Sequence, residues 1–111
     1  MSVPEMQWAV TSVERGKLQV KRIPVPKPGK GEILIKVLAA PINPSDLMFM
    51  KGYYEDYDVF HVQHPNVPGW EGCGIVIAAG GGITTWGWVG KRCSFFRKVH
   101  PNREKILGGA Y

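Results

Sequence analysis

The segment EILIKVLAAPINPSD, residues 32–46, predicts a strand that leads directly into a short helix. In its first part, Ile33, Ile35 and Val37 share one face, and the opposite face is apolar except for Lys36. A strand with two apolar faces is expected to be mostly buried. The strongest strand of the sequence is therefore predicted over residues 32–41.

The second part of this segment carries the signals that begin a helix. Asn43 can act as the N-cap, Pro44 occupies the first helical position, and Asp46 places an acid in the first turn. Gly52 stands where such a helix would end. The sequence therefore predicts one short helix over 44–51.

Short segments on both sides of this region predict further strands. Four of them fit the pattern: residues 6–13, 18–21, 74–79 and 92–96. The first two form a hairpin around Arg15-Gly16, whereas the three prolines within 23–28 restrict that stretch to an edge or a connector. Residues 53–68 show no periodicity and are expected to form a loop. With 14 glycines and 9 prolines, the chain must turn often, which favours an all-β fold.

Length and apolar patterning limit the class of protein. A chain of 111 residues suits one domain with a single core. No apolar run approaches the roughly 20 residues that cross a bilayer, and the beginning of the chain lacks the layout of a signal peptide. We therefore expect a soluble cytoplasmic protein without a membrane partner, with a mitochondrial location as the alternative.

Charge and cysteine usage indicate no specialised partner. The net charge of +5 gathers toward the end of the chain, in Lys91, Arg92, Arg97, Lys98, Arg103 and Lys105. No aromatic stacking array or nucleic-acid motif accompanies these residues, so we expect a solvated basic surface and no nucleic-acid partner. Cys73 and Cys93 form no CxxC pair and are expected to be buried free thiols.

Neither a dinucleotide site nor a metal site is complete in the sequence. The glycine clusters at 72–74 and 80–82 precede no helix pattern, so we expect them to end strands. His61 and His64 lack the paired ligand spacing of structural zinc and are expected to be loop residues.

A family resemblance rests on several motifs that follow one another along the chain. These are APINPSD (40–46), KGYY (51–54), PNVPGWEGCGIV (65–76), GKR (90–92) and GGAY (108–111). Their order and spacing resemble the GroES-like N-terminal domain of medium-chain dehydrogenases/reductases, especially the quinone oxidoreductase and enoyl-thioester reductase branch. The resemblance implies an all-β, partly open GroES-like β-barrel with one short helix. It also implies that residues 1–111 are a substrate-side domain, incomplete at its C-terminus and without the Rossmann cofactor domain.

Two departures from this family concern zinc. Zinc-dependent members carry a cysteine ligand near the short helix and a histidine in a Gly-His-Glu element. Here the first place holds Asn43-Pro44-Ser45-Asp46 and the second holds Gly69-Trp70-Glu71. A carboxylate without thiolate and imidazole partners makes a poor zinc site, so the resemblance implies a metal-free protein. Lys91 also replaces the usual acid of the Gly-acid-Arg turn.

The resemblance assigns roles to three residues. Tyr54 matches a tyrosine that contacts substrate or nicotinamide and is a candidate proton donor, although it could instead only pack on its loop. Asn43 matches an asparagine near the nicotinamide ribose, and Asp46 is a second candidate cofactor contact. Both could instead serve only the start of the helix. Glu71 is expected to be a structural hydrogen-bond acceptor.

The expected function follows from the missing Lewis acid and from the resemblance. Without zinc, hydride delivery suits acceptors that spread the incoming charge by conjugation. We expect the N-terminal part of an NAD(P)H-dependent oxidoreductase, with NADPH as cofactor and a quinone, enone or enoyl thioester as substrate. The full-length protein is expected to form a homodimer, and this chain alone is expected to be inactive. Two alternatives remain: a stand-alone binding module without enzymatic activity, and an enzyme that acts on an alcohol.

Overall fold

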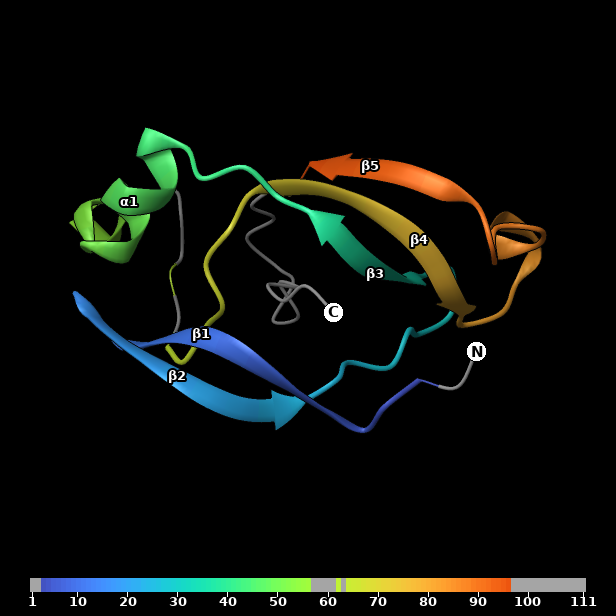
Figure 1. Ribbon diagram of the computed structural model, residues 1–111, viewed down its shortest axis with the longest axis horizontal. Coiled ribbons are helices and arrows are strands. Elements are labelled where there is room, and N and C mark those ends of the chain that lie inside the picture. Colours follow the sequence, from blue (N-terminus) through green and yellow to red (C-terminus); the bar gives the residue numbers. More distant parts are fainter. Residues whose placement is uncertain (1–2, 57–61, 63, 97–111) are drawn as a thin grey trace.

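The computed structural model describes residues 3–56, 62 and 64–96, and it confirms a mainly β chain with one α-helix in those ranges (Figure 1). The elements are β1 (Met6–Glu14), β2 (Lys17–Pro24), β3 (Ile33–Ala39), α1 (Pro44–Met50), the 3₁₀ turn η1 (Tyr53–Asp56), β4 (Glu71–Ala79), the 3₁₀ turn η3 (Ile83–Thr85) and β5 (Arg92–Phe96). The expected strand at 108–111 lies outside the described residues. None of the helices in the described ranges is long and apolar enough to cross a bilayer.

The strands form two antiparallel sheets, β1-β2 and β3-β4-β5. Figure 1 shows the hairpin along one side of the long axis, the three-stranded sheet along the other, and α1 at one end. Across the described residues the sheets stay open and do not close into a barrel. This arrangement agrees with the partly open fold that the sequence predicts.

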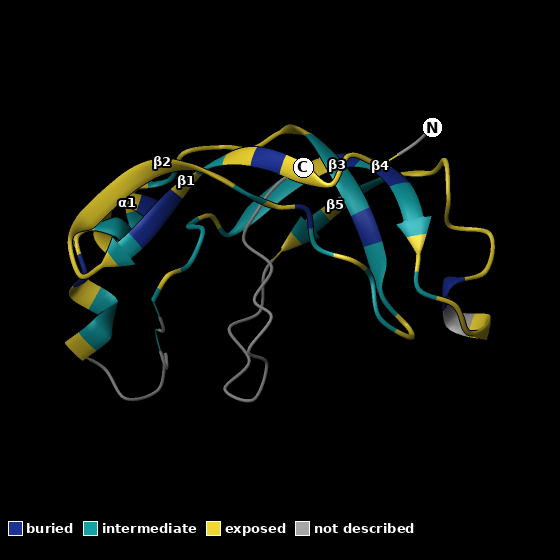
Figure 2. Ribbon diagram, turned by 90° about the horizontal axis from the view of Figure 1, so that it is seen from below, coloured by how far each residue is buried: buried dark blue, intermediate teal, exposed yellow. Residues whose placement is uncertain are grey.

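The hairpin turns its apolar face outward. It reverses at Gly16, whose φ of 72° lies in the left-handed region that glycine adopts without strain. Cross-strand partners share a face, and Val10 pairs with Val20. Both valines are exposed, whereas Gln7 and Thr11 on the opposite face are buried. Figure 2 shows both buried and exposed stretches along β1.

The core of the three-stranded sheet is small. It centres on Val76 of β4 and Leu34 of β3, and Val25 after β2 is buried as well. The expectation that β3 is mostly buried was wrong, because only Leu34 of this strand is buried. Among the described strands, β3 pairs with β4 alone, and Leu38 near its end is exposed.

β4 begins at Glu71, three residues before the predicted start. Gly74 lets this strand lie close to β3, since a Cβ atom there would come within 2.0 Å of the carbonyl oxygen of Lys36. A side chain at this position would therefore force the two strands apart.

The cysteines lie on opposite faces of the three-stranded sheet. Both are free, as expected, but Cys73 is exposed and Cys93 is half-buried, so the expected burial was wrong for Cys73. Cys73 pairs with Ser94, and Cys93 pairs with Gly74. Because neighbouring residues of a strand point to opposite faces, the two thiols point away from each other.

Helix α1 and the turn after it agree with the sequence in part. The helix starts at Pro44, and Gly52, with a φ of 86°, follows its C-cap residue. The next residues, predicted to be an irregular loop, begin instead with η1. The backbone N–H of Glu55 donates to the carbonyl oxygen of Gly52 at 3.2 Å, so η1 continues the chain reversal that the glycine starts.

Candidate functional site

Asn43, Asp46 and Glu71 meet where the start of α1 approaches the start of β4. The backbone N–H of Asn43 donates to Oδ2 of Asp46 at 2.7 Å, which is half of a capping box. The side-chain nitrogen of Asn43 donates to Oε1 of Glu71 at 2.9 Å. The structure therefore brings together two of the three predicted site residues and the expected acceptor Glu71.

Asp46 is the most deeply buried acid of this group. It is 4% exposed, and its second oxygen, Oδ1, has no hydrogen-bond partner within the described part of the chain. Buried carboxylate oxygens normally accept hydrogen bonds, because burial without a donor costs free energy. Asp46 thus has a helix-capping role and an acceptor oxygen that the described residues leave unsatisfied.

Tyr54 lies in an aromatic cluster with Phe49 of α1 and Trp70. Its ring centroid is 6.3 Å from that of Phe49 and 6.0 Å from that of Trp70, and the rings of Phe49 and Trp70 are 5.4 Å apart at nearly right angles. Such edge-to-face arrangements are favourable between aromatic rings. Since Trp70 directly precedes Glu71, the cluster connects Tyr54 to the group formed by Asn43 and Asp46.

A shallow open depression of about 390 Å³ lies beside Glu71. Its lining residues come from the ends of β3 and β4: Ala39, Ala40, Pro41, Glu71, Gly72 and Cys73. Small side chains and one carboxylate therefore face this space. The structure does not include Tyr54, Asn43 or Asp46 in its lining.

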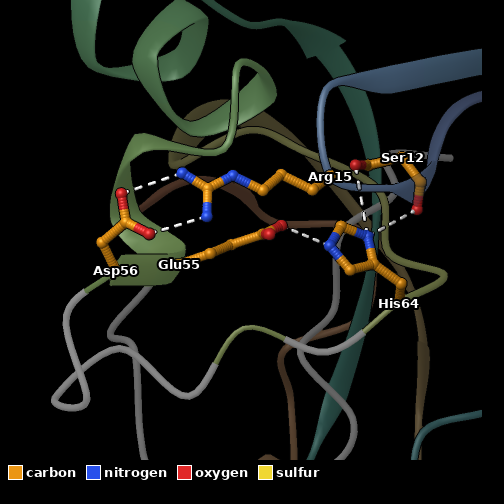
Figure 3. Close-up of polar contacts among 5 residues, drawn as sticks. All are labelled: Ser12, Arg15, Glu55, Asp56 and His64. Atoms are coloured by element: carbon orange, nitrogen blue, oxygen red, sulfur yellow. Dashed lines mark hydrogen bonds and ion pairs between the residues drawn. The ribbon is translucent and has the colours of Figure 1, made fainter.

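Sequence reasoning missed a second polar cluster, formed by Ser12, Glu55 and His64 (Figure 3). Nδ1 of His64 lies 3.2 Å from the carbonyl oxygen of Ser12 and 3.4 Å from its hydroxyl, and Nε2 contacts the carboxylate of Glu55. Ser12 is only 2% exposed, and its hydroxyl lies against His64. We assign this cluster to holding η1 and the segment around His64 against β1.

An exposed ion pair stands beside this cluster. The guanidinium of Arg15 donates to both carboxylate oxygens of Asp56, at 2.6 and 2.8 Å (Figure 3). The hydrogen bond from Arg15 lowers the pKa of Asp56 below its usual 3.8, and the same bond raises the pKa of Arg15. The pair joins the hairpin turn to η1.

These contacts connect residues that are far apart in the sequence, which explains why they were missed. His64 is 52 residues from Ser12, and Arg15 is 41 residues from Asp56. No spacing rule relates such positions. The described residues contain no group of three or more His, Cys, Asp or Glu side chains able to hold a metal ion, and His61 lies outside them.

In the described residues, two open antiparallel sheets and a short capped helix beside the start of β4 form a mainly β domain. Residues 29–111 match the alcohol dehydrogenase GroES-like domain, and the chain belongs to this family. The family expected from the sequence motifs is thereby confirmed.

Similar proteins include both alcohol dehydrogenases and quinone reductases. The chain is 44% identical over 81 residues to alcohol dehydrogenase 1 of Emericella nidulans, a match covering 72% of this chain and 22% of that protein. A mycobacterial protein solved with NADPH is 36% identical, with a TM-score of 0.66 and coverage of 80% and 27% of the two chains. A putative NADPH:quinone reductase from Mesorhizobium loti is 32% identical, with a TM-score of 0.68 and coverage of 89% and 32%. This chain spans less than a third of the length of each.

Proposed function

We propose that this chain is the substrate-side domain of a nicotinamide-dependent oxidoreductase that transfers hydride without zinc. The observation that carries the proposal is the hydrogen bond from the Asn43 side chain to Glu71. Zinc-dependent members of the family carry metal ligands in this region. Here, instead, the Asn43 amide donates a hydrogen bond to a carboxylate oxygen of Glu71. Trp70 takes the place of the histidine ligand.

The donor set does not fit a zinc centre. Structural and catalytic zinc sites take thiolate, imidazole and carboxylate ligands within bonding distance of one point. At this site Asn43 donates to both carboxylates, with its backbone N–H to Asp46 and its amide to Glu71, and the indole of Trp70 offers only a donor. We therefore derive no step of the reaction from zinc.

Two buried polar atoms at this site have unused hydrogen-bonding capacity, which a bound ligand could satisfy. Oδ1 of Asp46 and Nε1 of Trp70 lack partners in the described part of the chain. In addition, the Asn43 amide has two hydrogens, and the bond to Glu71 uses one. We propose that Asn43 and Asp46 are cofactor contacts near the nicotinamide ribose, and NADPH, when bound, would supply the hydride.

Most of the dinucleotide must bind elsewhere in this proposal. The glycines at 80–82 lead into the three-residue turn η3, not into the long helix of a dinucleotide-binding unit. Because the chain spans less than a third of its relatives, we propose that a Rossmann domain belongs to the same protein and that the active site lies between the two domains.

Tyr54 is the proposed proton donor. After hydride addition to a conjugated acceptor, a proton must reach the atom on which negative charge collects. The phenol is half-buried, and the rings of Phe49 and Trp70 fix the position of the tyrosine ring. Quinones, enones and enoyl thioesters are the proposed substrates, since they accept hydride without a Lewis acid.

The test measures NADPH oxidation by the full-length protein with a quinone, an enone and an enoyl thioester, before and after treatment with a chelator. We expect activity that survives chelation. Tyr54→Phe should lower kcat about 100-fold or more, whereas the neighbouring and more exposed Tyr53→Phe should leave it unchanged. Activity that disappears with the chelator and returns with zinc would contradict the proposal.

The second candidate is an alcohol dehydrogenase. Its support is the 44% identity to alcohol dehydrogenase 1 of Emericella nidulans. Stoichiometric zinc bound by the full-length protein, together with NAD(P)⁺-dependent oxidation of simple alcohols, would favour this candidate. Zinc content, alcohol oxidation and NADPH oxidation can all be measured on the same preparation, so one series of assays distinguishes the two functions.

A further inference from the structure

The loop between β4 and β5 presents large apolar side chains at one end of the molecule. Ile83 is 93% exposed, Trp86 is 86% exposed and Val89 is 58% exposed, with Trp88 at 41%. Figure 1 shows this loop, in orange, at the end of the long axis away from α1. We call residues 83–89 the apolar tip.

In the tip, Thr85 is buried, whereas Ile83, Trp86 and Val89 are exposed. Thr85 is 4% exposed, and its backbone N–H and hydroxyl both donate to the carbonyl oxygen of Gly82, at 3.3 and 3.1 Å. The backbone N–H of Trp86 donates to the carbonyl oxygen of Ile83 at 3.3 Å. Since side chains three residues apart lie on the same side of a 3₁₀ turn, Ile83 and Trp86 project together.

Backbone hydrogen bonds hold the base of the tip. The N–H of Gly90 donates to the carbonyl oxygen of Val76 at 2.8 Å, and the N–H of Gly31 donates to that of Gly81 at 3.0 Å. Gly81 and Gly82 both have a φ of 94°, a left-handed conformation that glycine permits. The exposed side chains therefore project from a turn that is fixed at both ends.

Basic residues flank the apolar tip. Lys91 and Arg92 follow it and are exposed, and Lys30 is exposed with its Cγ 3.9 Å from the place a Cβ of Gly82 would occupy. Residues 80–92 contain no acid. The nearby Glu32 uses a carboxylate oxygen to accept the N–H of Gly29 at 2.7 Å.

We propose that the apolar tip binds peripherally to an anionic phospholipid surface. Tryptophan favours the boundary between headgroups and acyl chains, and the aliphatic side chains of Ile83 and Val89 gain by leaving water. Lys30, Lys91 and Arg92 then face the lipid phosphates. This proposal departs from the sequence expectation of no membrane partner. That expectation rested on the absence of a spanning segment, which a surface turn does not require.

Vesicle flotation of the full chain tests this proposal. We expect binding to vesicles of phosphatidylcholine mixed with phosphatidylserine, weak binding to phosphatidylcholine alone, and loss of binding as salt concentration rises. The double variant Ile83→Ser/Trp86→Ser should reduce affinity about tenfold or more. Lys91→Gln should reduce it about fivefold, the effect of one cation near an anionic surface.

Ile42→Ser is the control. Ile42 is an apolar residue of comparable exposure, 80%, between β3 and α1, and its replacement should leave vesicle binding unchanged. Circular dichroism should show that every variant keeps the wild-type fold. Absence of binding, or equal loss in the Ile42 variant and in the Ile83/Trp86 double variant, would overturn the proposal. A dimer in light scattering that Trp86→Ser abolishes, without vesicle binding, would assign the tip to a second copy.

Discussion

Glu55 and Asp56 are neighbours in η1, yet their surroundings differ. The Glu55 side chain is 16% exposed and contacts His64, whereas the Asp56 side chain is 59% exposed and pairs with Arg15. Removing a partner from a part-buried network costs more than removing an exposed one. We expect Glu55→Ala to lower the free energy of unfolding by about 1–3 kcal/mol in urea titrations. Asp56→Ala, the control, should leave it close to wild type, and equal effects would contradict the assigned role of the His64 cluster.

The titration of Asp56 gives a second prediction for single residues. Its folded pKa lies below the usual 3.8, because Arg15 donates hydrogen bonds to the charged form. The contribution to stability is therefore fully present above about pH 4 and is lost as the pH falls through the lowered folded pKa. Arg15→Gln should move the Asp56 midpoint, followed by NMR of its carboxyl carbon, upward toward the ordinary value. An unchanged midpoint would show that the ion pair does not persist in solution.

At the scale of elements, the close approach of β3 and β4 depends on Gly74. A Cβ there would lie 2.0 Å from the carbonyl oxygen of Lys36 and 2.8 Å from its carbon, and neither backbone atom can move without moving β3. We expect Gly74→Ala to lower the free energy of unfolding by about 2–3 kcal/mol. Cys73→Ala, one residue earlier and exposed, should change it little. If both variants unfold alike, the strands are farther apart than the structure indicates.

Signals within a few residues of an element, such as caps, prolines and glycines, predicted where α1 and β5 begin. The N-cap, the following proline and Gly52 predicted α1. The short segment after the glycine-rich stretch predicted β5 at its observed bounds. Burial depends on tertiary neighbours instead. The two apolar faces of β3 therefore did not reveal that, in the described part of the chain, this strand has β4 as its one neighbour. In the same way, the Asn43 capping position was readable, whereas its bond to Glu71, 28 residues away, was not.

At the scale of the whole molecule, the hairpin exposes apolar side chains and buries polar ones. Trp8 is 72% exposed and Val20 is 69% exposed, while Gln7 and Thr11 are buried with side-chain atoms that have no partner within the described residues. An apolar face open to water favours association, and buried polar groups without partners weaken the isolated fold. The hairpin should therefore lower the stability of the separate chain.

This polarity predicts that the chain self-associates through the outer face of the hairpin. We expect the mass measured by sedimentation equilibrium to rise with concentration. Trp8→Thr with Val20→Thr should bring it back to that of the monomer, because threonine keeps the strand preference and removes most of the apolar surface. Ile42→Thr is the control, since Ile42 is 80% exposed but lies outside the hairpin. If the Ile42 variant alone restores the monomer, the association surface lies beside α1. If the wild-type mass does not change with concentration, the outer face of the hairpin tolerates water, and its apolar residues need another explanation.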